Sequence, residues 1–113
     1  TASPADASVM LRLLPSTAYT LSFYLKTNNV ATNGAYAFIR EYSGALSTLV
    51  TTNSTKLSGT NDWTLVTLNF TTNAATQFAA LALLNNVPGN VSDAWFDDIY
   101  LAPTTNPGRV VIT

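Results

Sequence analysis

Residues 19–27 read Tyr-Thr-Leu-Ser-Phe-Tyr-Leu-Lys-Thr, with apolar and polar side chains alternating through almost the whole stretch. Successive side chains of a β-strand point to opposite faces of its sheet. The stretch therefore predicts a half-buried strand, with one face in a core and the other in water. The inward residues are Tyr19, Leu21, Phe23 and Leu25, and the outward ones are Thr20, Ser22, Tyr24 and Lys26.

Short extended segments are expected on both sides of this strand, separated by clusters of Asn, Gly, Pro and Thr. Seven to eight short strands at regular spacing predict an all-β fold, a two-sheet antiparallel β-sandwich of the jelly-roll kind, as one domain over residues 1–113. Segments 28–34 and 58–62 are predicted as a loop and a turn, and 47–57 as an edge strand. A helix over 74–84 is the alternative there, since Ala and Leu favour helices. The remaining expected strands are 8–14, 35–43, 63–72, 78–85, 95–101 and, as a last strand or a tail, 109–112.

The stretch 93–101, Asp-Ala-Trp-Phe-Asp-Asp-Ile-Tyr-Leu, sets large apolar side chains around two adjacent carboxylates. In a regular strand, Trp95, Asp97 and Ile99 share one face with Leu101, so an inward Ile99 and Leu101 predict an inward Asp97. An unpaired buried carboxylate costs several kcal/mol, so strong donors or a bound cation are expected beside it. The two readings are a carboxylate held by backbone N–H groups and a calcium ligand at Asp97 and Asp98.

Composition excludes several classes of function. Of the 113 residues 47% are hydrophobic, enough for one sizeable core, while charged residues make up 10% and the net charge is −1. The chain has no basic surface for nucleic acid, and its longest apolar run, 78–84, is too short to cross a bilayer. The abundance of Thr, Asn and Ser suits a secreted protein that recognises neutral ligands.

Catalysis is poorly supported by the sequence, and the chain is predicted not to be an enzyme. It holds no Cys and no His, which excludes thiolate sites and His-assisted nucleophiles. A glycosidase needs two carboxylates about 5 to 10 Å apart that face one bond. The adjacent Asp97 and Asp98 would point to opposite faces of a strand, and Glu41 is the only glutamate.

Three segments together resemble the β-jelly-roll carbohydrate-binding modules of the family 4, 9 and 22 type: 19–26, Gly-Thr-Asn-Asp-Trp-Thr-Leu-Val at 59–66, and Trp-Phe-Asp-Asp-Ile-Tyr-Leu at 95–101. The resemblance covers roughly residues 8–103. It implies a non-catalytic module that tethers a secreted polysaccharide-degrading enzyme to plant or algal glycans, and a structural calcium. Such modules usually begin with a further strand that helps to hold the metal. No counterpart of that strand is found here, so the sequence is either an N-terminally truncated fragment or a form that dispenses with it.

Sugar recognition needs flat aromatic faces for the apolar side of a pyranose ring and planar polar groups for its hydroxyls. Tyr24 and Lys26 are outward by alternation. Arg40 favours an outward face for Tyr36 and Tyr42, although these tyrosines could instead be core aromatics beside an arginine that reaches solvent. The predicted ligand-binding residues are therefore Tyr24, Lys26, Tyr36, Arg40 and Tyr42.

Trp63 follows a turn and is expected to seal the end of the core, whereas Trp95 is open to either a core or a sugar-stacking role. The leading hypothesis is a carbohydrate-binding module of an extracellular or cell-surface, multidomain protein, binding a neutral polysaccharide. The alternative is a structural or adhesive β-sandwich of a bacterial surface protein.

Overall fold

A computed structural model describes residues 5–85 and 92–104, and every regular element among them is a β-strand. The predicted all-β class and the antiparallel sandwich are confirmed. This part of the chain holds no helix of the length and hydrophobicity needed to cross a membrane. The strands are β1 (Ala5–Arg12), β2 (Ala18–Tyr42), β3 (Thr48–Asn53), β4 (Leu57–Thr71), β5 (Phe78–Asn85) and β6 (Asp93–Pro103).

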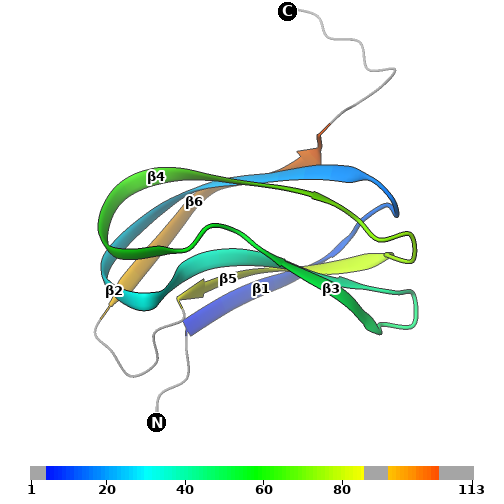
Figure 1. Ribbon diagram of the computed structural model, residues 1–113, viewed down its shortest axis with the longest axis horizontal. Helices are drawn as coiled ribbons and strands as arrows, with labels where there is room; N and C mark the ends of the chain where they lie inside the picture. Colours follow the sequence, from blue (N-terminus) through cyan, green and yellow to red (C-terminus); the bar gives the residue numbers. More distant parts are fainter. Residues whose placement is uncertain (1–4, 86–91, 105–113) are drawn as a thin grey trace, which may run out of the picture.

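Strand β2 is 25 residues long and links the whole fold. Its first half pairs with β4 and β6, its second half pairs with β3 and β5, and β1 pairs with β5. Between residues 25 and 35, the register of β2 against β4 shifts three times. Because such bulges bend a strand, the hydrogen-bonded sheet turns back on itself to form two layers (Figure 1).

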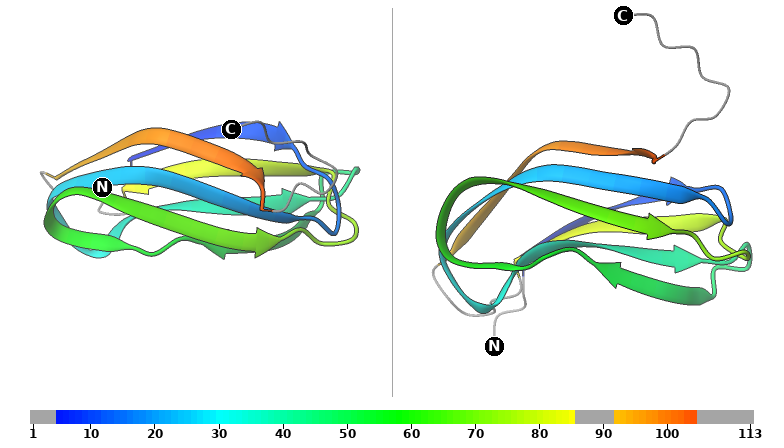
Figure 2. Two further views of the ribbon diagram at one scale, coloured as in Figure 1. Left: turned by 90° about the horizontal axis from the view of Figure 1, so that it is seen from above. Right: turned by 45° about the horizontal axis from the view of Figure 1, so that its top comes forward.

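The two layers enclose the core. Layer A consists of β4, residues 18–27 of β2, and β6, which lie side by side in the right view of Figure 2. Layer B consists of β1, β5, residues 35–42 of β2, and β3. The alternation predicted for 19–27 is confirmed, since all four inward residues are buried. The apolar core side chains with no exposed surface are Leu21, Phe23, Leu25, Ala35, Ala37, Ile39 and Ala79.

Gly34 is required where the bend of β2 meets the start of β4. Its φ is +83°, a region that L side chains rarely adopt, and an added Cβ would lie 2.9 Å from the Cβ of Lys56. The Asn-Gly pair at 33–34 therefore lets two strand segments approach closely and does not end the strand.

The structure differs from the expected strand list at two turn-rich segments. The expected loop 28–34 lies inside β2, and the expected turn 58–62 lies inside β4. These segments remain paired with each other, because Thr27 pairs with Asn61 and Val30 with Gly59. Asn and Gly residues here supply the bulges of a bent ladder, so two expected strands merge into β2.

Two further expectations have clear outcomes. Residues 78–85 form the strand β5, so the helical alternative for this region is wrong. Within the described residues β3 pairs with β2 alone, so the expected edge strand exists, but it covers Thr48–Asn53 of the expected 47–57, and Leu57 begins β4. The expected segment 109–112 lies outside the described residues.

Candidate functional site

A bulge in β6 reverses the predicted orientation of part of that strand. Tyr24 pairs with Asp97 but Ser22 pairs with Tyr100, so one residue more lies on β6 than on β2 between these pairs. Asp98 lies within this bulge and has φ +51°. A bulge exchanges the faces of the residues on its two sides, which no regular alternation can anticipate.

The prediction that Asp97 points into the core is therefore wrong, and Trp95, which the sequence left open between a core and a sugar-stacking role, does not lie in the core. Phe96 is the inward residue, and its ring centroid lies 5.6 Å from that of Phe23 in the core. Trp95 is 43% exposed and Asp97 is exposed as well. Leu101 does pack against the core, because it lies beyond the bulge.

The outer surface of layer A carries a group of exposed apolar and aromatic side chains, here called the platform. Tyr24 is 40% exposed and pairs with Leu65 on β4 and with Asp97 on β6. Lys26 pairs with Trp95, and its Nζ lies 5.5 Å from the Trp95 ring centroid. The platform consists of Tyr24, Lys26, Trp63, Leu65, Trp95 and Tyr100, from three neighbouring strands.

Trp63 belongs to the platform and does not seal the core, contrary to expectation. It is 45% exposed, and alternation along β4 places it on the same face as Leu65. The alternation of side chains along β4 could have predicted the outward position of Trp63. Val66 is buried, and Trp63 lies three residues before it, so alternation assigns the two side chains to opposite faces.

The platform continues into a polar region toward the end of β6. Thr20 pairs with Asn69 on β4 and with Ala102 on β6. Its hydroxyl donates to Asn69 Oδ1 over 2.8 Å and lies 2.7 Å from the hydroxyl of Thr104. The same face therefore offers aromatic rings at one end and hydroxyl and amide groups at the other.

The other three predicted ligand residues lie on the outer face of layer B. Tyr36, Arg40 and Tyr42 alternate with the inward Ala37 and Ile39 along β2. Tyr36 is only 8% exposed, and the Nζ of Lys56 lies 4.8 Å from its ring centroid.

Arg40 is similarly engaged, because its guanidinium lies 4.9 Å from the Phe38 ring centroid and its Nε donates to Thr51 Oγ1 over 3.1 Å. The bend of β2 thus separates the predicted residues. The structure brings Tyr24 and Lys26 together but places Tyr36, Arg40 and Tyr42 across the core from them.

Asp97 and Asp98, the predicted metal ligands, are both exposed, so the argument from a buried carboxylate does not hold. Asp97 Oδ1 accepts the backbone N–H of Asp98 over 2.8 Å. Calcium takes six to eight oxygens, whereas no group of three or more acidic, His or Cys side chains suited to a metal occurs within residues 5–85 and 92–104. A calcium here would need oxygens from backbone, water or residues outside these ranges.

The buried carboxylate of the fold is instead Glu41, which is 1% exposed. Its Oε1 accepts the backbone N–H of Asn73 over 2.8 Å and the hydroxyl of Thr76 over 2.6 Å. Thr76 is itself fully buried. Glu41 therefore ties the turn between β4 and β5 to the end of β2, and its oxygen is engaged in structure.

No family model and no curated protein matches this chain. Solved structures do resemble it. A structure titled "Family 16 Carbohydrate Binding Module-2" aligns with a TM-score of 0.67 and 20% identity, over 89% of this chain and 72% of that one. A structure titled "CBM4 structure and function" aligns with a TM-score of 0.60 and 16% identity, over 87% of this chain and 60% of that one.

At these identities the likeness shows the fold alone. This chain has the fold of carbohydrate-binding modules, and it spans less than two thirds of the second structure.

Proposed function

We propose that this chain is a non-catalytic carbohydrate-binding module of a secreted or cell-surface, multidomain protein, and that its platform holds a neutral polysaccharide of plant or algal type. The platform carries the proposal. It sets four exposed aromatic rings, those of Tyr24, Trp63, Trp95 and Tyr100, on adjacent strands of one sheet. The fold it shares with carbohydrate-binding modules supports the same function.

The chemistry of the platform suits sugar rings. A pyranose presents a face of C–H groups that packs on an aromatic ring, while its hydroxyls require donors and acceptors. The rings stand on a hydrogen-bonded sheet, which holds them in place before the ligand arrives and so limits the entropy lost on binding. Lys26 lies on the platform and Asp97 lies beside Tyr24 on the same face. Their opposite charges balance, which favours a neutral glycan over a charged one.

The outer face of layer B is the second location for the same function. Its Tyr36, Arg40 and Tyr42 belong to the residues predicted from the sequence. Cations lie 4.8 and 4.9 Å from the Tyr36 and Phe38 ring centroids, closer than the 5.5 Å of Lys26 from Trp95 on the platform. Tyr36 is also only 8% exposed, whereas Trp95 is 43% exposed, so layer B offers a sugar less open ring surface. The two faces lie on opposite sides of the core, so they cannot hold the same sugar units.

Substitution of one ring on each face distinguishes the two locations. We expect Trp95→Ala to weaken polysaccharide binding about tenfold, equivalent to about 1.4 kcal/mol, because one stacking ring is lost. Tyr42→Ala on the other face serves as the matched control and should leave binding unchanged. The measurement is retardation in native gels that contain xylan, β-glucan or mannan, with thermal unfolding of each variant alongside.

Three outcomes are informative. Loss of retardation with Tyr42→Ala alone would move the site to layer B. A large fall in melting temperature with Trp95→Ala would show a structural ring. If the unsubstituted chain migrates equally with and without every glycan, the proposal is wrong and the adhesive module becomes the better reading, because exposed apolar surface of this kind also marks protein interfaces.

A structural calcium at Asp97 and Asp98 is a further part of the proposal. An ion that binds the folded chain and not the unfolded one raises stability by about 2.7 kcal/mol when its concentration is one hundred times its Kd. Calcium should then raise the melting temperature and a chelator should lower it.

Asp97→Asn and Asp98→Asn should each remove that calcium dependence. Both carboxylates are exposed, so we expect the two substitutions to have similar effects on calcium binding. Magnesium at equal concentration serves as the control for ionic strength. Identical melting curves with calcium and with chelator would exclude the site.

A further inference from the structure

Layer B extends one strand beyond layer A on the side of β1 and β6. The order β3, β2, β5, β1 gives layer B four strands, whereas layer A has three, β4, β2 and β6. Val9 of β1 pairs with the core residue Leu81 and therefore points inward, yet it is 51% exposed. The inner face of β1 thus lacks a covering strand within the described residues.

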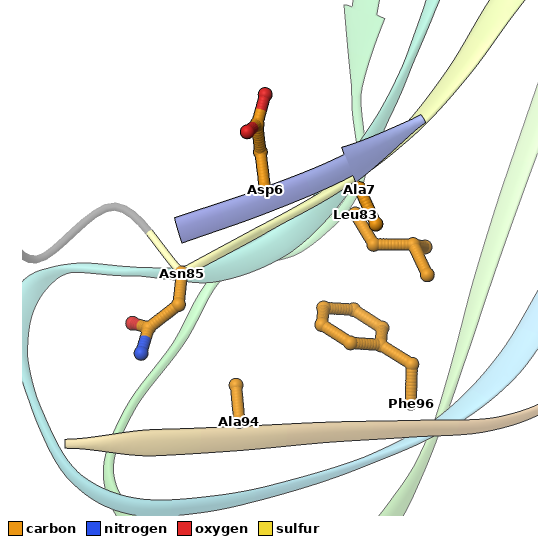
Figure 3. A pocket seen from close by; sticks show the side chains of 6 residues that line it. All are labelled: Asp6, Ala7, Leu83, Asn85, Ala94 and Phe96. Carbon is orange, nitrogen blue, oxygen red and sulfur yellow. The ribbon is translucent and has the colours of Figure 1, made fainter. Parts of the chain in front are cut away.

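An apolar groove occupies this position. Three adjoining hollows follow it from the start of β6 to its end, and the largest has a volume of about 450 Å³. Ile99, 42% exposed, faces two of these hollows across from Leu81, and Leu83 lines two as well. Figure 3 shows the first hollow, where Leu83 of β5 faces Phe96 of β6.

The strands beside the groove have free edges. Within residues 5–85 and 92–104, β1 pairs only with β5 and β6 only with β2, so each has one side without a β partner. Asn85, which lines the same end of the groove, has a buried Oδ1 without a hydrogen-bond donor, while its Nδ2 donates to Ser92 Oγ over 3.2 Å. In Figure 3 this side chain extends from β5 toward Ala94 of β6. Free strand edges favour a ligand with backbone N–H and C=O groups, because these pair with the unpaired groups of the edge.

The charges around the groove favour a basic ligand. Asp6 lies on β1, and Asp93, Asp97 and Asp98 lie on β6. These are four of the six acidic residues of the chain, and all four are exposed. Asp6 pairs with Leu84 and points away from the groove (Figure 3), so a strand added at the edge of β6 would bring its outward side chains near the three carboxylates of β6.

We propose that the groove binds an extended peptide that adds to the free edge of β6 as a further strand of layer A. Apolar residues at every second position of the peptide pack on Val9, Leu83 and Ile99, and basic residues between them face the surrounding aspartates. This inference does not require a glycan on the platform, but it shares Asp97 with the platform face and Asp97 and Asp98 with the proposed calcium site, so the peptide is tested in the absence of calcium.

A synthetic nine-residue peptide of alternating lysine and valine is a suitable probe of the 113-residue chain. Hydrogen exchange at the backbone amides of β6 should slow at least tenfold in the presence of the peptide, because its strand pairs with that edge. Val9→Asp should weaken peptide binding at least tenfold and is tolerated because Val9 is half exposed. Val50→Asp is the matched control, since Val50 is a similarly exposed valine on the edge strand β3; it should change nothing.

Two peptide controls test the mechanism on the unsubstituted chain. N-methylation of alternate residues removes the N–H groups that pair with β6 and should abolish binding, and so should glutamate in place of lysine. If the methylated peptide binds as well as the unmethylated one, charge attraction alone explains the binding and the proposal is wrong. Protection of β6 without any peptide, either by residues 105–113 or by a second copy in a concentration-dependent dimer, would overturn it too, because the groove would then be already filled.

Discussion

Phe23→Ala should lower the free energy of unfolding by about 3 to 5 kcal/mol, the usual cost of removing a buried phenylalanine ring. Phe23 has no exposed surface, pairs with Val66 and packs against Phe96 of β6. The substitution therefore opens a cavity where all three strands of layer A meet. Urea unfolding followed by tryptophan fluorescence measures the change.

Tyr24→Ala is the control for Phe23→Ala, because the two residues are adjacent in the same strand and point to opposite faces. An exposed substitution usually changes stability by about 0.5 kcal/mol or less. A similar loss of stability in both variants would contradict the assignment of faces in β2, and with it the position of the platform.

Glu41→Ala should cost about 2 to 5 kcal/mol, since it removes the acceptor of two hydrogen bonds to a charged group. The hydroxyl of Thr76 is fully buried and would be left without that acceptor, and the backbone N–H of Asn73 would lose its partner. Thermal and urea unfolding both report the loss.

Glu41→Gln is the matched variant, because its amide oxygen keeps the shape and accepts the same two hydrogen bonds without the charge. We expect it to cost about 1 kcal/mol, well below the cost of Glu41→Ala. If alanine and glutamine prove equally mild, the turn between β4 and β5 is held by other contacts and Glu41 has no anchoring role.

Alternation predicted the fold best where a strand has one wet and one buried face. Residues 19–25 have that pattern, and their inward side chains are all buried. Segments 28–34 and 58–62 were misassigned because Asn and Gly mark turns and bulges alike, and only pairing across the bend distinguishes the two. The pairing of Thr27 with Asn61 depends on residues 34 positions apart, which local sequence does not report.

The candidate site was predicted correctly only where its strands alternate regularly. Tyr24 and Lys26 were placed correctly on an outward face, because β2 is regular there. Asp97 was placed inward and Trp95 was left open, because the bulge at Asp98 shifts the alternation by one residue and the sequence does not reveal it. The separation of Tyr36, Arg40 and Tyr42 from Tyr24 follows from the bend of β2, a property of the long strand as a whole and not of either half.

The central place of β2 also has a consequence for how the chain folds during synthesis. Both layers are built on β2, yet β4, β5 and β6 all follow it in the sequence, and Tyr24 meets its β6 partner 73 positions later. A chain that leaves the ribosome from its N-terminus gains the β3, β4 and β5 partners of β2 first, and must hold the first half of β2 without β6 until the last strand has been made. Layer B has all its strands once β5 is made, but layer A and the closed core need β6, so folding should end in a late event dominated by distant pairings, on the slow millisecond-to-second scale of β-sandwiches.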